Sequence, residues 1–299
     1  MPPFRRVAIV GVGLIGGSIG LAVRRHVRGA RVVGVDRKAV LRAARARRAM
    51  DEATTSLARG LQGADLVILA LPVDAILEIL PRVAVLLPQG AVVTDVGSTK
   101  EAIDRAARRA GLGARFVGGH PMAGSERSGI AHADGRLFAG APWVLCRPEG
   151  AAASRRVAAR QGGSDSTRRV AALVRRLGAR PAFLDPRAHD NAMARLSHLP
   201  QLVSVALTNA AGDREARPFL HLSGPGLLRM SRLAESPPGL WDAILRTNRR
   251  AATRALDAFT REIRRLRASL GSGPAVHFRR AARVRARLLS EGRGGATLW

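Results

Sequence analysis

Residues 7–36 read VAIVGVGLIGGSIGLAVRRHVRGARVVGVD, and this stretch predicts the fold of the first half of the chain. A short apolar run leads directly into Gly11, Gly13 and Gly16 in the spacing G-x-G-x-x-G. A helix-length segment follows, and a second apolar run ends in Asp36. A strand, a glycine turn, a helix, a second strand and an acid in this order are typical of a dinucleotide-binding βαβ unit.

Each glycine of the turn has a predicted role in holding a dinucleotide. Gly11 permits a tight turn, Gly13 has no Cβ to obstruct a pyrophosphate, and Gly16 lets the helix pack closely against the strand. The first turn of the helix also presents N–H groups and the positive end of its dipole to the phosphates. We therefore predict a cofactor-binding loop made of Gly11, Gly13, Leu14, Ile15 and Gly16.

Asp36 predicts which dinucleotide binds. It stands about 20 residues after the last glycine of the turn, where its carboxylate can accept hydrogen bonds from the adenosine ribose hydroxyls. A carboxylate there repels the 2′-phosphate of NADP, which favours NAD. Arg37 and Lys38 follow directly and soften that repulsion, so NADP stays open as an alternative, and Arg37 joins the predicted cofactor contacts.

The composition limits the classes of protein to which the chain can belong. It has 299 residues, enough for one large or two ordinary domains, and its single cysteine excludes a disulfide framework and a cysteine-based metal cluster. The formal net charge is +28, carried mainly by arginines spread along the chain, and aromatic residues make up only 3%. We interpret this as a general bias towards arginine, and we expect no nucleic-acid partner and no metal. A basic surface still attracts an anionic substrate.

Beyond Asp36 the chain alternates between apolar runs and helical segments. The expected strands are 65–71, 91–96, 115–117, 142–146 and 179–184, and the expected helices are 38–50, 73–80, 101–110 and 170–177. This alternation predicts an α/β fold, a Rossmann-type doubly wound parallel sheet. Residues 148–167 are small and polar, which is typical of a surface loop.

From His189 onward the sequence is predicted to be entirely helical. Apolar residues recur at helical spacing, most clearly over 189–211 and 241–270. We predict three parts, namely a dinucleotide-binding domain over 1–186, an all-helical domain over 187–290, and a tail over 291–299, with one further helix over 275–289.

Polar residues gather at the carboxyl ends of the predicted strands, where open α/β sheets bind their ligands. They are Pro72, the turn 97–100 and the segment 120–126, and the helical half adds 197–200, Arg232 and Trp241. This combination resembles the prephenate/arogenate dehydrogenase family. The matching segments are GVGLIGGSIG (11–20), DLVILALPV (65–73), TDVGSTK (94–100), FVGGHPMAGSERSG (116–129), HDNAMARLSHLPQ (189–201) and SRLAESPPGLW (231–241).

The resemblance implies oxidative decarboxylation of prephenate, or of its amino analogue arogenate, with a nicotinamide cofactor in tyrosine biosynthesis. His120 matches the family's general base, which takes the proton of the ring hydroxyl as a hydride leaves the same carbon, and an imidazole suits this task near pH 7. Ser98 matches a serine that hydrogen-bonds the histidine and the substrate. The matched substrate-binding residues are His198, Arg232, Ser125, Glu126 and Trp241, and Pro72 joins the cofactor contacts.

Three of these residues have structural alternatives. His120, which precedes a proline, can cap a turn, and His198 on an apolar helix can be an ordinary core histidine. Ser98 can be the N-cap of the following helix, with Glu101 three residues on completing a capping box. These alternatives stay open at the level of sequence.

One departure from the family pattern bears on the substrate. Arg229 stands where an acidic residue can occur, and a further cation suits the doubly anionic prephenate better than the ammonium group of arogenate. We therefore favour prephenate with NAD. Arogenate dehydrogenase or dual cyclohexadienyl dehydrogenase activity is the alternative.

Two rival interpretations belong to other classes. A β-hydroxyacid dehydrogenase has a similar architecture but relies on a lysine in its helical half, and this chain has no lysine after Lys100. The other rival is a basic nucleotide-binding or nucleic-acid-binding protein without catalysis, and the joint presence of His120, Ser98 and Arg232 argues against it. The surplus of apolar helix surface predicts a homodimer through the helical domain, as the family resemblance also implies. We see no bilayer-spanning stretch and no secretory signal, so we expect a cytoplasmic protein. We see no chorismate-mutase-like helical segment before the glycine turn and no β-rich regulatory module after the helices, so we expect a monofunctional enzyme.

Overall fold

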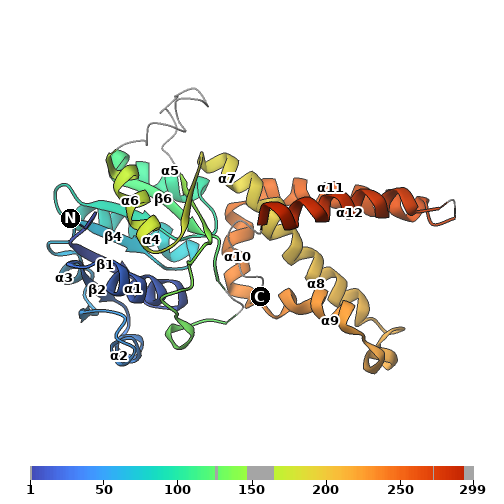
Figure 1. Cartoon of the computed structure of the whole chain (residues 1–299), viewed down its shortest axis with the longest axis horizontal. Coiled ribbons are helices and arrows are strands. Elements are labelled where there is room, and N and C mark those ends of the chain that lie inside the picture. Colours follow the sequence, from blue (N-terminus) through green and yellow to red (C-terminus); the bar gives the residue numbers. More distant parts are fainter. Residues whose placement is uncertain (1, 125–126, 147–164, 272, 293–299) are drawn as a thin grey trace. The chain divides into compact units, whose positions relative to one another are not determined.

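The computed structural model describes residues 2–124, 127–146, 165–271 and 273–292 (Figure 1). The chain divides into two compact units, Met1–His189 and Asp190–Trp299. This division and the predicted boundary after residue 186 both fall within helix α7 (Pro186–Met193). Most of the predicted surface loop and the last seven residues of the predicted tail, 293–299, lie outside the described residues.

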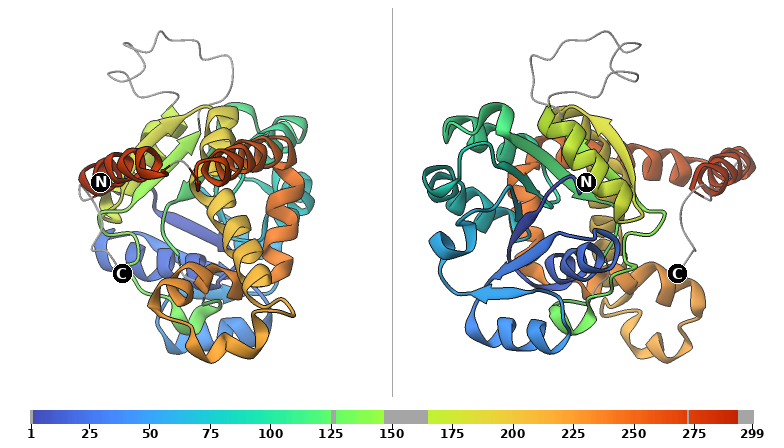
Figure 2. Two further views of the ribbon diagram at one scale, coloured as in Figure 1. Left: turned by 90° about the vertical axis from the view of Figure 1, so that its right-hand side faces the viewer. Right: turned by 60° about the vertical axis from the view of Figure 1, so that its left-hand side comes forward.

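The first unit is built around an eight-stranded sheet in the order β3-β2-β1-β4-β5-β6-β7-β8, flanked by helices (Figure 2). The strands are β1 (Arg6–Val10), β2 (Arg31–Val35), β3 (Glu52–Thr54), β4 (Leu66–Leu69), β5 (Val92–Asp95), β6 (Phe116–Pro121), β7 (Pro142–Cys146) and β8 (Arg180–Leu184). The helices are α1 (Leu14–His26), α2 (Lys38–Ala46), α3 (Leu57–Leu61), α4 (Val73–Leu86), α5 (Glu101–Arg109) and α6 (Asp165–Arg176), with short 3₁₀ turns η1 (Gly113–Arg115) and η2 (Ile130–His132). The predicted doubly wound α/β fold is confirmed.

Buried apolar runs explain the central strands. Every residue of β4 and β5 is buried, because helices cover both faces of the sheet and both faces must then be apolar. Strand β1 lies between β2 and β4 and is parallel to both, with Val7 beside Val32 and Leu66. The strand order changes direction between β1 and β4, so the carboxyl ends of these two strands form the switch point at which such sheets bind ligands.

The sheet departs from an all-parallel arrangement at one pairing. Strand β7 is antiparallel to β6, with His120 opposite Val144, and β8 is parallel to β7. Among the described residues only the short turn η2 forms a helix between β6 and β7. Parallel neighbours need a crossover connection, usually a helix, and α6 provides it between β7 and β8. Antiparallel neighbours such as β6 and β7 need no such crossover.

Two local differences from the predicted elements have physical causes. Helix α2 ends at Ala46 rather than at Met50, because Arg48 adopts a left-handed conformation (φ +57°) and the chain turns back so that Met50 enters the core. The three-residue strand β3, which has no apolar run to announce it, follows directly. Helix α4 continues through Pro81, because its buried stripe includes Leu80 and Val83 on either side of the proline.

The second unit is helical throughout its described residues, as predicted. Its elements are the last part of α7, a π-helical turn η3 (Ala194–His198), α8 (Leu199–Ala211), η4 (Arg217–Leu222), α9 (Pro225–Ser231), η5 (Arg232–Glu235), α10 (Pro238–Thr247), α11 (Arg249–Ala268) and α12 (Ala275–Gly292). The predicted continuous segment 241–270 is two helices, since the backbone breaks at Asn248 (φ −120°, ψ 28°). No helix among the described residues is long and apolar enough to cross a membrane.

Candidate active site

The glycine turn lies at the carboxyl end of β1 and leads into α1. Gly11 has φ +91°, and a Cβ there would stand 2.3 Å from the carbonyl oxygen of Ala70, just beyond β4. A Cβ on Gly16 would stand 1.9 Å from the carbonyl oxygen of Gly11. At Gly13, the N-cap of α1, a Cβ would meet no protein atom within 4 Å. Two glycines therefore close the turn, and the third leaves open space beside the helix N-terminus.

This open space is suited to a phosphate group. The N-cap of α1 is Gly13, which has no side chain to accept a hydrogen bond from the N–H groups of Leu14 and Ile15 in the first turn. They combine with the positive end of the helix dipole to form an anion site. Pro72, the N-cap of α4, lies close in sequence to Ala70, which contacts the glycine turn. The glycine turn and the chain just after β4 thus lie at the switch point of the sheet, and the turn fits a dinucleotide.

Asp36 holds the glycine turn in place from the end of β2. Its Oδ2 accepts a hydrogen bond of 2.7 Å from the Val12 N–H, and its Oδ1 accepts one of 2.6 Å from the Arg37 N–H. The carboxylate has further lone pairs that can receive ribose hydroxyls. The Arg37 side chain is 89% exposed and lies 4.0 Å from Asp36. Asp36 therefore carries a fixed negative charge next to the cofactor cradle.

A buried ion pair joins the ends of β5 and β6. Lys100 Nζ contacts Asp95 Oδ2, and both side chains are completely buried. Lys100 also donates to the carbonyl oxygen of Gly119 (2.8 Å), and the N–H of Gly119 donates to Asp95 Oδ1 (3.0 Å). Asp95 Oδ2 accepts a further bond of 2.8 Å from the Gly97 N–H. These bonds fix the backbone on both sides of the turn that carries Ser98, and the residue before His120.

Ser98 is half-buried on this turn and is not the N-cap of α5. The N-cap position belongs to Lys100, whose side chain makes no capping hydrogen bond. The predicted capping box with Glu101 is therefore wrong. Because Lys100 turns its side chain to Asp95, the chain bends around the buried pair before the helix begins.

His120 lies near the carboxyl end of β6 and is half-buried. Its Nδ1 is 2.8 Å from Nε2 of His189 on α7, and the two rings meet edge to face with centroids 5.1 Å apart. His189 is completely buried. No sequence pattern assigns an individual role to His189, Asp95 or Lys100, although Lys100 belongs to the polar turn 97–100. The only signal for them was their presence inside the segments HDNAMARLSHLPQ and TDVGSTK.

In the second unit the structure brings His198 and Trp241 together. His198 is buried, and its ring meets the Trp241 indole edge to face with centroids 5.9 Å apart. Asn248, at the break between α10 and α11, donates to the carbonyl oxygen of Asp190 (2.7 Å) and lies 3.4 Å from His198 Nδ1. The buried indole nitrogen of Trp241 has no hydrogen-bond partner among the described residues.

Arg232 lies at the start of η5, one residue before Leu233. Gln201, in the first turn of α8 and three residues after His198, donates to the carbonyl oxygen of Leu233 (2.7 Å). The side chain of Arg232 is exposed. The first turn of α8 therefore supports both His198 and the backbone beside Arg232. Two predicted substrate-binding residues, Ser125 and Glu126, lie outside the described residues.

The widened turn η3 before His198 has a local cause. Pro200 in the first turn of α8 has no N–H, and its ring would clash with the carbonyl group four residues earlier in a regular helix. A π-helical turn relieves this contact, and such turns are frequent at functional sites.

The Rossmann-type sheet, the glycine turn and Asp36 define an NAD-binding oxidoreductase fold with an added helical domain. Residues 19–159 match the nucleotide-binding domain of prephenate dehydrogenase, and residues 185–283 match the dimerization domain of prephenate dehydrogenase. A prephenate dehydrogenase of Lactococcus lactis is 31% identical over 264 residues, which are 87% of this chain and 69% of that protein. The chain belongs to the prephenate dehydrogenase family.

Two solved structures resemble the chain over nearly its whole length. Prephenate dehydrogenase from A. aeolicus, in complex with hydroxyphenyl propionate and NAD+, has a TM-score of 0.79 and 27% identity, with 95% of this chain and 98% of that chain covered. Synechocystis arogenate dehydrogenase has a TM-score of 0.73 and 30% identity, with 96% and 99% covered. The resemblance therefore includes proteins named for each of the two substrates considered above.

Proposed function

We propose that the protein is a prephenate dehydrogenase that converts prephenate to 4-hydroxyphenylpyruvate and CO₂ with NAD. The observation that carries the proposal is the position of His120 beside the buried Asp95–Lys100 pair, in the same unit as the glycine turn and Asp36. Bound NAD supplies the acceptor for the hydride that leaves the ring carbon. The residues of the chain bind, orient and move a proton.

His120 acts as the general base in this proposal. Its Nδ1 faces His189, so Nε2 is the nitrogen that can accept the proton of the ring hydroxyl as the hydride departs. Loss of the ring carboxylate as CO₂ then leaves an electron pair that makes the ring aromatic. The ring oxygen takes back a proton from His120, so the reaction releases no net proton. Ser98, half-buried on the turn that Asp95 and Lys100 hold, donates to the same oxygen and orients it.

The family resemblance assigns the substrate contacts to residues of the second unit. Arg232 pairs with a carboxylate, since a planar guanidinium can grip both oxygens. His198 and Trp241 form an edge-to-face pair, and the family resemblance assigns both to the substrate site. Arg229, exposed on α9, adds positive charge three residues before Arg232. This charge favours the doubly anionic prephenate over arogenate.

The test measures absorbance at 340 nm with purified protein, offering prephenate or arogenate with NAD or NADP. We expect the fastest reduction with prephenate and NAD, and a loss of at least about 100-fold in kcat for His120→Asn with NAD affinity unchanged. Arogenate as the better substrate would overturn the assignment of substrate. No reduction with any pair, despite measured NAD binding, would leave a nucleotide-binding protein without this activity.

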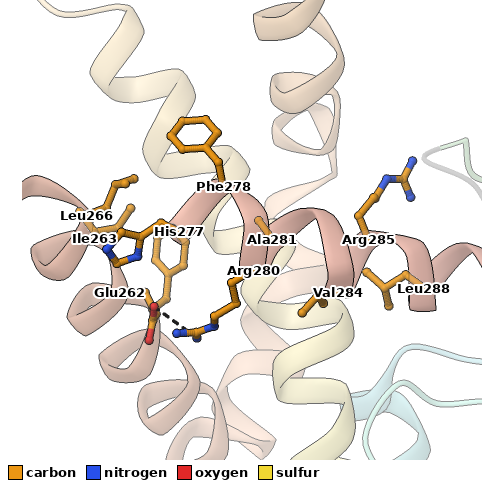
Figure 3. A pocket seen from close by; sticks show the side chains of 11 residues that line it. Glu262, Ile263, Leu266, His277, Phe278, Arg280, Ala281, Val284, Arg285 and Leu288 are labelled. Carbon is orange, nitrogen blue, oxygen red and sulfur yellow. Dashed lines mark ion pairs between the residues drawn. The ribbon is translucent and has the colours of Figure 1, made fainter. Parts of the chain in front are cut away.

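We also infer that the protein is a homodimer in the cytoplasm, where NAD is available, and that its second unit forms the dimer contact. An apolar groove of about 620 Å³ lies between α11 and α12 (Figure 3). Ile263, Phe278, Val284 and Leu288 line it and are 48 to 66% exposed in the single chain. The match to a dimerization domain supports a second copy as the occupant. Exposed apolar surface of this kind marks an interaction site.

The size of the assembly tests this inference. Sedimentation velocity on the wild-type protein is expected to give a dimer, and Phe278→Glu is expected to shift it towards the monomer because a carboxylate would be buried in the contact. The matched control is Arg279→Glu, which changes charge at the neighbouring exposed position of the same helix. A wild-type monomer, or equal dissociation of both variants, would contradict this contact.

A further inference from the structure

The contact between His120 and His189 has the geometry of a hydrogen bond between their rings. The 2.8 Å separation between His120 Nδ1 and His189 Nε2 is that of a hydrogen bond, so one proton lies between two ring nitrogens. Only one nitrogen of the pair can donate in that bond, which couples the protonation of one ring to that of the other. The arrangement therefore selects a tautomer of His120.

The proposed reaction distinguishes the two orientations of this bond. If His120 carries its proton on Nδ1 and donates it to His189, its Nε2 carries the lone pair that accepts the substrate proton. If His189 donates instead, a neutral His120 carries its proton on Nε2 and cannot act as a base there. In many sites the hydrogen-bond partner of one ring nitrogen decides whether the other nitrogen of a functional histidine carries a proton. That partner is commonly a carboxylate or a carbonyl group.

Hydrogen bonds fix the backbone on both sides of the histidine pair. His189 is completely buried and sits on the first turns of α7, where its N–H donates to the carbonyl oxygen of Asp185 (2.9 Å). Asp185 Oδ1 also accepts from the Ala188 N–H (2.7 Å), which fixes the start of the helix. On the other side, the bonds from Lys100 and Asp95 to Gly119 fix the backbone next to His120. The backbone that carries each ring is therefore held by hydrogen bonds.

We propose that His189 is a positioning residue that accepts a hydrogen bond from Nδ1 of His120 and so keeps its Nε2 unprotonated for the substrate. This role rests on the proposed function of His120. His189 does not touch the substrate in this scheme and acts only through the ring of His120. A buried neutral imidazole performs the orienting task that a carboxylate performs in other sites, without placing a negative charge beside a doubly anionic substrate.

The first test is a ¹⁵N NMR measurement of the histidine tautomers in the full-length protein at neutral pH. His120→Asn assigns the His120 signals by their disappearance. We expect a protonated Nδ1 and an unprotonated Nε2 for His120 in the wild type. A proton on Nε2 would overturn the proposal. This measurement needs no substrate, so it stands apart from the failure or success of the dehydrogenase assay.

The second test compares two substitutions at His189. His189→Leu removes the acceptor at similar volume and is expected to lower kcat about 10- to 100-fold, with KM within about threefold and the Nδ1–H tautomer of His120 no longer dominant. His189→Gln places an amide oxygen near the position of Nε2 and is expected to recover most of kcat. His26→Leu, on the exposed end of α1, is the control and should leave kcat unchanged.

Each outcome has a definite meaning. A His189→Leu variant with wild-type kcat, or a folded His189→Gln variant as impaired as His189→Leu, would overturn the positioning role. If His189→Leu does not fold, the tautomer of the wild type and the kcat of His189→Gln decide the matter. An inactive wild type would refute the proposed function, while the tautomer would still report whether the pair is oriented as we propose.

Discussion

Substitution of Gly13 by alanine separates cofactor binding from folding. Gly13 has a negative φ (−80°), as an L residue requires, and its ψ of −148° lies only about 30° beyond the extended region. The new Cβ would meet no protein atom within 4 Å. Alanine is about 0.5–1 kcal/mol worse than glycine at an N-cap, and it stiffens the unfolded chain by about 0.4–1 kcal/mol in the opposite direction. We therefore expect the free energy of unfolding to change by less than about 1 kcal/mol.

The same methyl group stands where the pyrophosphate of NAD must approach the first turn of α1. Displacing the phosphates lengthens their hydrogen bonds to the helix N–H groups, and a loss of at least about 1.4 kcal/mol corresponds to a tenfold weaker Kd. Isothermal titration calorimetry with NAD measures the affinity, and urea unfolding measures the stability. We expect the affinity for NAD to fall tenfold or more and the free energy of unfolding to stay nearly constant.

Gly16→Ala is the matched control, because its Cβ would lie 1.9 Å from the carbonyl oxygen of Gly11. This overlap involves backbone that cannot move aside, so we expect a loss of stability of about 3 kcal/mol or more. Wild-type NAD affinity in a folded Gly13→Ala variant would refute the placement of the pyrophosphate at α1. Unfolding of Gly13→Ala would refute the open space inferred at that position.

Three further predictions concern the ion pairs and the substrate. Lys100→Met leaves the buried charge of Asp95 without its cation and should lower the free energy of unfolding by about 3–5 kcal/mol. A double-mutant cycle with Asp95→Asn should show a coupling of more than about 1 kcal/mol, and additive effects would contradict the pair. Hydrogen bonds from Arg6 hold the pKa of Glu52 below its ordinary 4.5, so the pair stabilises the fold above that pH and loses its effect as the pH falls through the lowered pKa. Because both side chains are partly exposed, Glu52→Gln should lower the free energy of unfolding by under about 1 kcal/mol at pH 7 and leave it unchanged at acid pH, as measured by thermal or urea unfolding. A larger loss of stability at acid pH than at pH 7 would contradict the predicted pH dependence. Arg232→Gln should raise KM for prephenate about 10- to 100-fold with little change in the melting temperature, since its side chain is exposed, and an unchanged KM would remove it from the site.

Much of the first unit was predictable because its signals are local. The glycine spacing, the apolar runs of β1 and β4 and the position of Asp36 each reflect constraints that act within one βαβ unit. The structure adds the bond from the Val12 N–H to Asp36, which is a consequence of that same short geometry. The family resemblance extended the prediction to His120 and Ser98, whose places at the ends of β6 and β5 follow from the sheet.

The limits of the sequence appear where contacts join distant segments. Nothing local in His189 indicates that it meets a ring 69 residues earlier in the chain. The direction of β7 depends on which neighbour it pairs with, and the break at Asn248 depends on the carbonyl group of Asp190 that its side chain reaches. The roles of Lys100 and Asp95 also emerge only from burial, because a charged residue is read from sequence as exposed.

The amino-acid sequence alone was therefore sufficient for the fold class, the cofactor turn and the segments that carry the chemistry, since short-range geometry and apolar patterning encode them. The tertiary structure was needed to find the partner of each functional group. A buried ion pair and a histidine pair exist only when the folded chain removes water from them and holds them at bonding distance. Those long-range contacts set the position of His120 and the side of its ring that faces His189.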